Sequence, residues 1–417
     1  MAKIEKIIAR EILNSTGYPT IEAIVQLADK SMGVSSSPSG TSKSKYEAIE
    51  IRDIDSKRFQ GKGVLEGLRK IHSTLAPRLI GQDAQNQEQI DQIITTADGT
   101  PNKSNLGSNV TIAISTAIAK AQATSQKMPV YQYIAKLQSA NIHEFVIPTP
   151  MFNILNGGQH ADGNLDFQEF MVVTPRSSSY SLSLRLGAEI YYALRETIKS
   201  HSAIALIGDE GGYAPTLYSN IDALKILEEA VARAGYKFGW DAFISLDIAA
   251  SHIKQGSSYK IKDRPVALSA NDLLDFFLVL NEQYHLLSLE DPFDQDDWDQ
   301  WRALTEKLGG ETLITGDDLI ATNYSRLEKC ISQKAANAVV IKPNQAGTIT
   351  EALRVVKAAK EANFKIIVSH RSGETNDDSI ADFAVGVGAD YVKFGAPARG
   401  ERVAKYNRLL EIEYELS

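Results

Sequence analysis

The chain has 417 residues, 43% of them hydrophobic and 23% charged, with a formal net charge of −8. This length suits two or three domains, the composition is that of a globular protein with a large core, and the acidic balance argues against nucleic-acid binding. One cysteine excludes a disulfide framework and a cysteine-built zinc site, and no apolar run approaches the ~18 residues of a membrane span. The first residues lack a signal peptide's apolar region, so we expect a cytoplasmic protein.

Residues 1–140 are predicted to form a small α+β domain. Alternating apolar residues predict a hairpin of two strands, at 4–13 and 20–27. A Ser- and Gly-rich stretch at 35–45 is flexible by composition. Helical periodicity then predicts three helices, at 64–79, 86–97 and 106–127. The join to the next domain is expected at 140–145.

Residues 141–417 alternate between apolar, strand-like runs and mostly helical stretches. This rhythm is typical of a parallel sheet, and so many units predict a closed (β/α) barrel of the α/β class. The expected strands are 146–155, 167–173, 203–207, 243–246, 286–289, 313–315, 338–341, 365–368 and 391–394.

Polar residues follow six successive predicted strands, in the order Asp247, Glu290, Asp317, Lys342, His370-Arg371-Ser372 and Lys393. From Glu290 onward the intervals are 27, 25, 28 and 23 residues, about one βα unit each. The carboxyl ends of barrel strands form the active-site face, so these side chains should meet at one mouth. Any one of them could be a loop cap or a solvated charge, but six in phase favour a site.

The residue types indicate metal-assisted chemistry on an anion. Asp247, Glu290 and Asp317 form an all-oxygen set that prefers Mg²⁺ to Zn²⁺. Lysine, with a pKa of about 10.4, can act as a base only if burial or nearby cations lower that pKa. Lys342 and Lys393 are therefore either a base with its partner or a simple anion clamp, and spacing leaves both open. Arg371 and Ser372 could hold a phosphate or carboxylate, although Ser372 could also cap a helix.

The sequence resembles enolase (phosphopyruvate hydratase) over essentially its whole length. The resemblance is carried by Pro38-Ser39-Gly40, Asn156-Gly157-Gly158, Gln168-Glu169-Phe170-Met171, Gly208 to Pro215, Gly316-Asp317-Asp318-Leu319 and Ser369 to Thr375. It implies a small N-terminal α+β domain, residues 1–140, followed by a modified TIM-type barrel, ββαα(βα)₆, residues 141–417. It also implies the reversible dehydration of 2-phospho-D-glycerate, a small phosphorylated three-carbon acid, to phosphoenolpyruvate in glycolysis and gluconeogenesis, by a cytoplasmic homodimer or larger homo-oligomer.

The resemblance further implies a role for each site residue. Asp247, Glu290 and Asp317 would hold one Mg²⁺, and Ser39 would ligate a second that binds with substrate. Lys342 would remove the C2 proton, and Glu210, with Glu169 beside it, would protonate the leaving C3 hydroxyl. Lys393 would steady the carboxylate, Arg371 and Ser372 would grip the phosphate, and the remaining substrate contacts would come from His160, Gln168 and His370.

Several positions depart from the family pattern, and they leave two alternatives open. The departures are Asn14, Thr16, Tyr18, Lys43, Ser44, Gln159, Pro343 and Phe394. Those beside the lysines motivate a paralogue that dehydrates a related phosphonate or phospho-acid. The other alternative is a non-catalytic surface-binding or scaffold role. It is weakened because the family's surface binding is associated with C-terminal lysines, whereas this chain ends Tyr-Glu-Leu-Ser.

Overall fold

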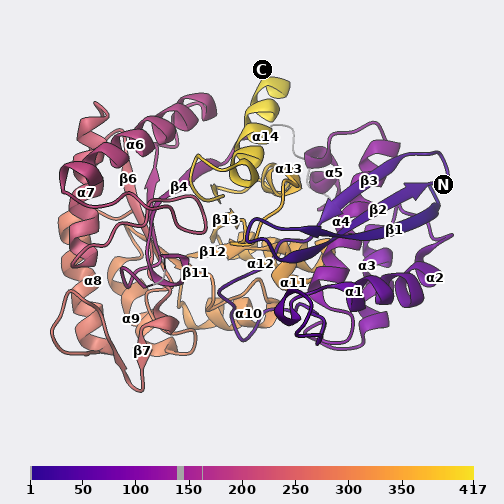
Figure 1. The fold of residues 1–417 in the computed structure, drawn as a ribbon, viewed down its shortest axis with the longest axis horizontal. Coiled ribbons are helices and arrows are strands. Elements are labelled where there is room, and N and C mark those ends of the chain that lie inside the picture. The colour runs from indigo at the N-terminus through magenta and orange to yellow at the C-terminus, as the bar shows by residue number, and fades with distance from the viewer. Residues whose placement is uncertain (1, 139–144, 162) are drawn as a thin grey trace.

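The computed structural model describes residues 2–138, 145–161 and 163–417. A small N-terminal domain lies beside a larger barrel, with helices of the barrel against the helices of the small domain (Figure 1). The predicted boundary between residues 140 and 141 falls outside the described residues. Within them, no helix has the length and apolar character needed to cross a membrane.

The N-terminal domain packs helices on an antiparallel sheet of three strands in the order β1-β2-β3. The strands are β1 Ile4–Leu13, β2 Pro19–Leu27 and β3 Met32–Ser36. The helices are α1 Leu65–Lys70, α2 Ala76–Leu79, α3 Gln87–Asp98, α4 Ser108–Ser125 and α5 Val130–Leu137, with a π-helical turn at Ile71–Leu75. The predicted hairpin and three helical regions are all present. The predicted flexible stretch begins inside β3, because its first residues pair with β2.

Helix α4 is the core of this domain, with most of its residues buried against β2 and β3. Its close approach depends on Gly33 in β3, where an added Cβ would lie 2.0 Å from the backbone oxygen of Ala117. The alternating residues of β2, such as Ile21 and Val25, complete the core. Strand β2 therefore buries alternate side chains along much of its length, whereas α4 is buried on nearly all sides.

The barrel is closed by eight strands in the order β10-β11-β12-β13-β14-β4-β5-β6. Strand β5 runs antiparallel to both its neighbours, and the other pairs are parallel. The strands are β4 Thr149–Asn156, β5 Glu169–Val173, β6 Phe243–Asp247, β10 Ser288–Glu290, β11 Leu313–Gly316, β12 Ala338–Ile341, β13 Lys365–Ser369 and β14 Tyr391–Lys393. The helices are α6 Tyr180–Ser200, α7 Asn220–Arg233, α8 Ala270–Tyr284, α9 Trp298–Leu308, α10 Tyr324–Gln333, α11 Pro343–Ala346, α12 Ile349–Glu361, α13 Ser379–Gly386 and α14 Gly400–Leu416. This order is ββαα(βα)₆, as expected.

One predicted strand, 203–207, is wrong. The segment is a surface connection after α6, and Ile204, Leu206 and Ile207 are 73%, 60% and 56% exposed. The large apolar side chains of this segment do not pack into the barrel core, so the strand prediction, which rested on composition, was wrong. A small separate sheet, β7 Lys254–Gln255, β8 Ser258–Tyr259 and β9 Leu268–Ser269, lies between β6 and α8 and has no clear apolar signal.

The register of the parallel strands brings their carboxyl ends to one level. Glu290 pairs across the sheet with Asp247 on one side and Thr315 on the other. Ser369 pairs with Lys393 in the same way. The N-terminal domain closes over part of this edge, because Ser39 and Gly373 exchange backbone hydrogen bonds of 2.8 Å.

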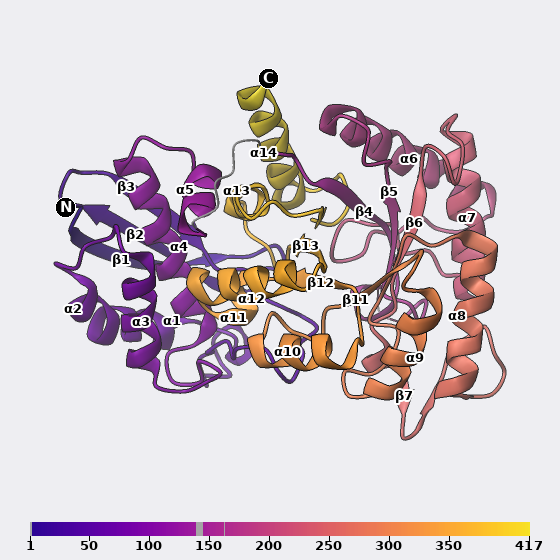
Figure 2. The ribbon, with the colours of Figure 1, turned by 180° about the vertical axis from the view of Figure 1, so that it is seen from behind.

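A buried carboxylate joins the two domains away from this edge. Asp91 of α3 accepts hydrogen bonds from Ser115 Oγ (2.7 Å) and from the backbone N and Oγ1 of Thr350 (2.9 and 2.6 Å). Thr350 begins α12, which lies between the N-terminal helices and the barrel (Figure 2). Burial raises the pKa of Asp91, and its hydrogen-bond donors oppose that rise.

We expect Asp91→Ala to destabilise the protein by about 2–4 kcal/mol, because it leaves several buried donors without an acceptor. Thermal unfolding, with the midpoint compared to that of the unaltered protein, measures this. The matched control is Asp83→Ala. It removes a carboxylate from a more exposed turn nearby, where Asp83 Oδ1 accepts a hydrogen bond from the backbone N of Gln85 in the same turn. Equal midpoints for the two variants would contradict a joining role for Asp91.

Candidate active site

A small cavity lies at the carboxyl ends of the barrel strands. Its walls are almost entirely polar, and nearly every residue predicted for the site is among them. The lining residues are Ser42, His160, Gln168, Glu169, Glu210, Asp247, Lys342, Ser369, His370, Arg371, Ser372 and Lys393. Glu290 and Asp317, buried at the neighbouring strand ends, contact this lining through the two lysines. The phasing of strand-end residues therefore predicted the convergence correctly.

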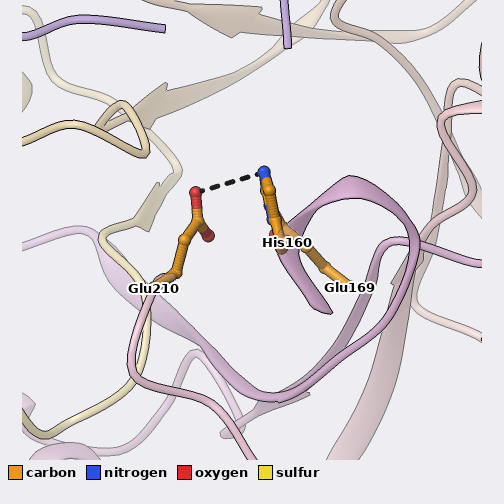
Figure 3. A group of neighbouring side chains, drawn as sticks. All are labelled: His160, Glu169 and Glu210. Atoms are coloured by element: carbon orange, nitrogen blue, oxygen red, sulfur yellow. Dashed lines mark ion pairs between the residues drawn. The ribbon is translucent and has the colours of Figure 1, made fainter. Parts of the chain in front are cut away.

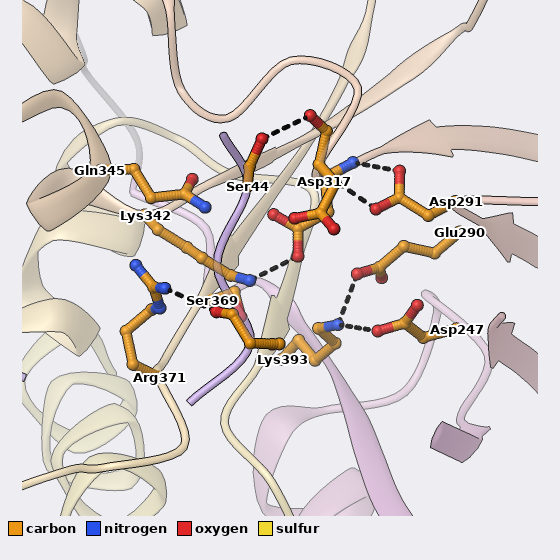
Figure 4. A network of polar contacts seen from close by, with 12 residues as sticks. Ser44, Asp247, Glu290, Asp291, Asp317, Lys342, Gln345, Ser369, Arg371 and Lys393 are labelled. Carbon is orange, nitrogen blue, oxygen red and sulfur yellow. Dashed lines mark hydrogen bonds and ion pairs between the residues drawn. The ribbon is translucent and has the colours of Figure 1, made fainter. Parts of the chain in front are cut away.

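The two lysines are each paired with strand-end carboxylates (Figure 4). Lys393 Nζ lies 2.6 Å from Glu290 Oε1, 3.4 Å from Asp247 Oδ2 and 3.3 Å from Glu169 Oε2. Lys342 Nζ pairs with Asp317 Oδ2. Both ammonium groups are buried, and the carboxylates provide the charge that makes this burial tolerable.

The predicted metal ligands Asp247, Glu290 and Asp317 have uncommitted oxygens. Glu290 Oε2 and Asp317 Oδ1 are buried without a hydrogen-bond partner in the part of the chain that the structure describes. Burial, together with the neighbouring charge of Asp247, raises the pKa of Glu290 well above its usual value. A cation would satisfy both the unpartnered oxygens and the excess negative charge, and carboxylate oxygens are the ligands that Mg²⁺ prefers. The residue types therefore suit Mg²⁺, although Lys342 and Lys393 lie between the carboxylates.

Among the described residues, one group has its potential ligand atoms close enough together to hold a metal, and it combines His160 with two glutamates (Figure 3). One ligand atom from each of His160, Glu169 and Glu210 falls within 4.8 Å of the others, and all three side chains are buried. Glu169 Oε1 faces His160 Nδ1 at 3.6 Å, whereas Glu210 Oε1 faces His160 Nε2 at 3.7 Å. The two carboxylates therefore face different nitrogens of the imidazole ring, at distances longer than a hydrogen bond.

The two glutamates hold protons very differently. Burial, reinforced by the charges of Glu210 and Asp247, raises the pKa of Glu169 well above its usual value despite the attraction of Lys393. Burial also acts to raise the pKa of Glu210, but His160, His370 and Arg402 outweigh it and bring this pKa well below its usual value. The surroundings therefore move the pKa values of these two carboxyl groups in opposite directions. Two carboxyl groups whose pKa values are pushed apart are typical of an acid–base site.

His370 is buried beside Glu210, with His370 Nε2 3.1 Å from Glu210 Oε2. Burial lowers the pKa of His370 to about 4, and the nearby Arg402 acts in the same direction, so its ring is neutral at neutral pH. Arg402 Nη1 lies 2.8 Å from His370 Nδ1 and fixes the ring from behind. A neutral imidazole next to an ionised carboxylate can donate one hydrogen bond without adding charge.

Arg371 and Ser372 face the cavity from the loop after β13. Ser372 Oγ lies 3.2 Å from His160 Nε2, and Arg371 is buried with its guanidinium beside Glu47 of the N-terminal domain. Gln168 reaches Asp247 Oδ2 at 3.3 Å through its Nε2 atom. The site thus combines donors for an anion on one side with an acid–base pair on the other.

Ser39, predicted as a metal ligand, does not line the cavity. Its hydroxyl accepts a 2.6 Å hydrogen bond from Arg52 Nη2, and its backbone pairs with Gly373. Ser42, three residues later in the same loop, lines the cavity in its place. The sequence contained several serines in this stretch and no signal for which one faces the site, because that depends on how the loop lies against the barrel.

A lysine that acts as a base needs a lowered pKa, but in this structure the pKa of Lys342 is raised. Burial lowers that pKa, as do Arg371 and Lys393, but Asp317 outweighs them and the pKa is raised. Spacing along the chain identified the two lysines but could not indicate that a carboxylate pairs with each. If a cation bound Asp317, burial, Arg371 and Lys393 would favour the neutral form of Lys342, and Glu290 would oppose them.

The loop over the cavity is fastened to the barrel by an aromatic side chain. The Arg326 guanidinium lies 3.8 Å from the centre of the Tyr46 ring and 4.6 Å from that of Trp298, so it is stacked between them. Tyr46 Oη also donates a 2.7 Å hydrogen bond to Asp296. Nearby, Ser44 Oγ donates to Gln295 Oε1 at 2.9 Å. Cation–π stacking and these hydrogen bonds stabilise the closed position of the loop.

We expect Tyr46→Ala to loosen this loop and to speed trypsin cleavage after Lys43 and Lys45 by about fivefold, since a lost stack of ~1 kcal/mol raises the open population by that factor. Limited proteolysis with mass spectrometry of the fragments measures it. Tyr324→Ala is the matched control, because Tyr324 stacks with Arg354 at the same 3.8 Å outside this loop. Faster cleavage in the control, or none in Tyr46→Ala, would contradict the assignment.

Two family models together cover nearly the whole chain. The model described as "Enolase, N-terminal domain" matches residues 4–134, and that described as "Enolase, C-terminal TIM barrel domain" matches residues 144–417. The chain belongs to the enolase family. Membership in this family agrees with the ββαα(βα)₆ barrel, with the strand-end carboxylates and lysines, and with a buried group able to hold a metal.

Proposed function

We propose that the protein is a phosphopyruvate hydratase, a hydro-lyase that interconverts 2-phospho-D-glycerate and phosphoenolpyruvate. One observation carries the proposal: the cavity brings together two lysines, a histidine-flanked glutamate pair and the Arg371-Ser372 anion donors. The same lining contains none of the positions that depart from the family pattern. Phe394, for example, is fully buried against Tyr406, with ring centres 5.8 Å apart.

Lys342 is proposed to remove the proton from C2 of the substrate, and Lys393 to steady the negative charge that develops on its carboxylate. We propose that Asp247, Glu290 and Asp317 hold Mg²⁺, with Ser39 as a ligand of a second Mg²⁺ that binds together with substrate. When bound, Mg²⁺ supplies the positive charge that makes a proton next to a carboxylate acidic enough to be removed.

Glu210 is proposed to protonate the departing C3 hydroxyl, with His160 and Glu169 in support. His160 lies between the carboxyl groups of Glu169 and Glu210 with one ring nitrogen toward each, and burial raises the pKa of Glu169. His370 Nε2 lies 3.1 Å from Glu210 Oε2, and Gln168 donates a hydrogen bond to Asp247. Arg371 and Ser372 are proposed to hold the phosphate.

We further propose that the enzyme acts in glycolysis and gluconeogenesis in the cytoplasm as a homodimer or larger homo-oligomer. The segment with Ile204, Leu206 and Ile207 exposes three large apolar side chains in succession, which suits contact with another copy. Sedimentation velocity tests this, and a purely monomeric protein would contradict it.

Adding 2-phosphoglycerate and Mg²⁺ to the protein and following the ultraviolet absorbance of phosphoenolpyruvate tests the reaction itself. We expect turnover that is lost when Mg²⁺ is removed with a chelator and restored when it is added back. Folded, Mg²⁺-loaded protein without turnover would overturn the proposal. Turnover of a phosphonate analogue in its place would favour the paralogue. The cavity walls contain none of the residues that depart from the family pattern, which argues against a paralogue.

A further inference from the structure

A carboxylate from the N-terminal domain contacts the arginine of the site. Both oxygens of Glu47 lie 3.1 Å from Arg371 Nη2, which also donates to the backbone oxygen of Ser42 at 3.2 Å. Arg371 Nη1 donates to Asn344 Oδ1 at 3.3 Å. One edge of the guanidinium is therefore occupied, and its Nε–H and one Nη1–H have no such partner among the described residues.

The approach is too close to be incidental. An added Cβ at Gly40 would lie 1.8 Å from Arg371 Nη2, so a larger residue there would displace the guanidinium. Glu47 is 6% exposed and Arg371 4%. A buried carboxylate and guanidinium in this geometry form a charge-assisted contact that fixes the plane of the arginine.

Glu47 is in turn fixed by a chain of buried hydrogen bonds that reaches the proposed base. Gln345 Nε2 donates to Glu47 Oε2 at 3.0 Å, and Gln345 Oε1 accepts from Thr322 Oγ1 at 2.9 Å. Thr322 Oγ1 accepts from the backbone N of Lys342 at 2.9 Å. The chain therefore connects the lysine and the arginine of the site, and Glu47 of the N-terminal domain accepts hydrogen bonds from both Gln345 and Arg371.

We propose that Glu47 is a positioning residue that aims the free N–H donors of Arg371 at the phosphate of the substrate. The inference rests on the proposed function, in which Arg371 binds that phosphate. A carboxylate this close also opposes an anion electrostatically, so its presence is explained by orientation rather than by charge. Orientation is where an arginine fork gains most over a point charge.

Binding of inorganic phosphate, measured by calorimetry in the presence of Mg²⁺, tests the inference without turnover. We expect Glu47→Ala to weaken binding about tenfold or more, since misaimed donors lose both hydrogen bonds. Glu47→Gln keeps an acceptor for Arg371 and should stay within about threefold of the unaltered protein. Gln345→Ala, which releases Glu47 without touching Arg371, should weaken binding by a smaller factor and provides a second route if Glu47→Ala folds poorly.

Two comparisons make the result decisive. The double variant Glu47→Ala/Arg371→Ala should bind phosphate no more weakly than Arg371→Ala alone, because Glu47 acts through the arginine. Glu351→Ala removes a different interdomain carboxylate, which lies outside the cavity and pairs with Lys103 Nζ at 2.7 Å. This variant should leave phosphate binding unchanged. KM for 2-phosphoglycerate should rise in Glu47→Ala in parallel with the phosphate Kd, with kcat changed less.

Unchanged or tighter phosphate binding by Glu47→Ala would overturn the inference, as would additive losses in the double variant. Absence of turnover by the unaltered protein would overturn the proposed function, yet the phosphate comparison would still decide the role of Glu47. No phosphate binding by the unaltered protein would overturn the inference as well.

Discussion

Lys342→Ala is expected to abolish exchange of the C2 proton of 2-phosphoglycerate with solvent and to lower kcat by about 10⁴-fold. A positioned general base contributes up to about this factor. Lys393 lies in the same cavity, but its ammonium group is held by three carboxylates, which raise the pKa of Lys393 well above its usual value against the effect of burial. It is therefore the poorer proton acceptor of the two.

Nuclear magnetic resonance in D₂O follows the exchange directly by loss of the C2 proton signal. Lys307→Ala, which removes an exposed lysine near the end of α9, is the matched control and should exchange like the unaltered protein. Retained exchange in Lys342→Ala would mean that another group removes the proton. Thermal unfolding of both variants checks that any loss of exchange does not result from destabilisation of the barrel, where Lys342 pairs with Asp317.

The barrel and the cluster of site residues were predictable because both depend on local periodicity. Each βα unit places one polar residue at the end of a buried strand, and the regular intervals after Glu290 make these positions stand out in the sequence. The register pairs Glu290–Asp247 and Ser369–Lys393 follow from parallel strands of similar length. Such features need no knowledge of distant contacts.

The loop residues were less predictable because their direction is decided by contacts between domains. Ser39 turns to Arg52 and Ser42 to the cavity, although both lie in one Ser- and Gly-rich stretch. Glu47, which contacts Arg371 across 324 positions of sequence, carries no local signal of a site residue. The positions of the loop side chains could therefore be learned only from the structure, whereas the residue types in the sequence were enough to indicate the chemistry.

The departures near the N-terminus are explained locally. Asn14 Oδ1 accepts hydrogen bonds from the backbone N and Oγ1 of Thr16 (3.0 and 2.7 Å) and from the backbone N of Tyr18 (3.3 Å). The Tyr18 ring in turn lies under Lys62 Nζ, 3.9 Å from its centre. The substituted residues thus form a self-contained turn, and none of them lines the cavity.

Glu210→Gln is expected to separate the two halves of the reaction. Lys342 and the strand-end carboxylates are untouched, so C2 proton exchange should stay within about tenfold of the unaltered protein. Loss of the C3 hydroxyl should fall by about 10³- to 10⁴-fold, because an amide cannot deliver a proton to the leaving group. The amide keeps the volume of Glu210 and a partner for Asn153 Nδ2, which donates to Glu210 Oε2 at 3.0 Å, so folding should be little affected.

Measuring exchange and phosphoenolpyruvate formation on the same sample makes the comparison internal. Asp209→Asn changes the adjacent, exposed carboxyl group of the same glycine-rich turn in the same way and should alter neither rate. Loss of both exchange and dehydration in Glu210→Gln would show that Glu210 acts before the proton leaves C2. Normal dehydration would instead transfer the acid role to Glu169, whose pKa burial raises and which faces the opposite nitrogen of His160.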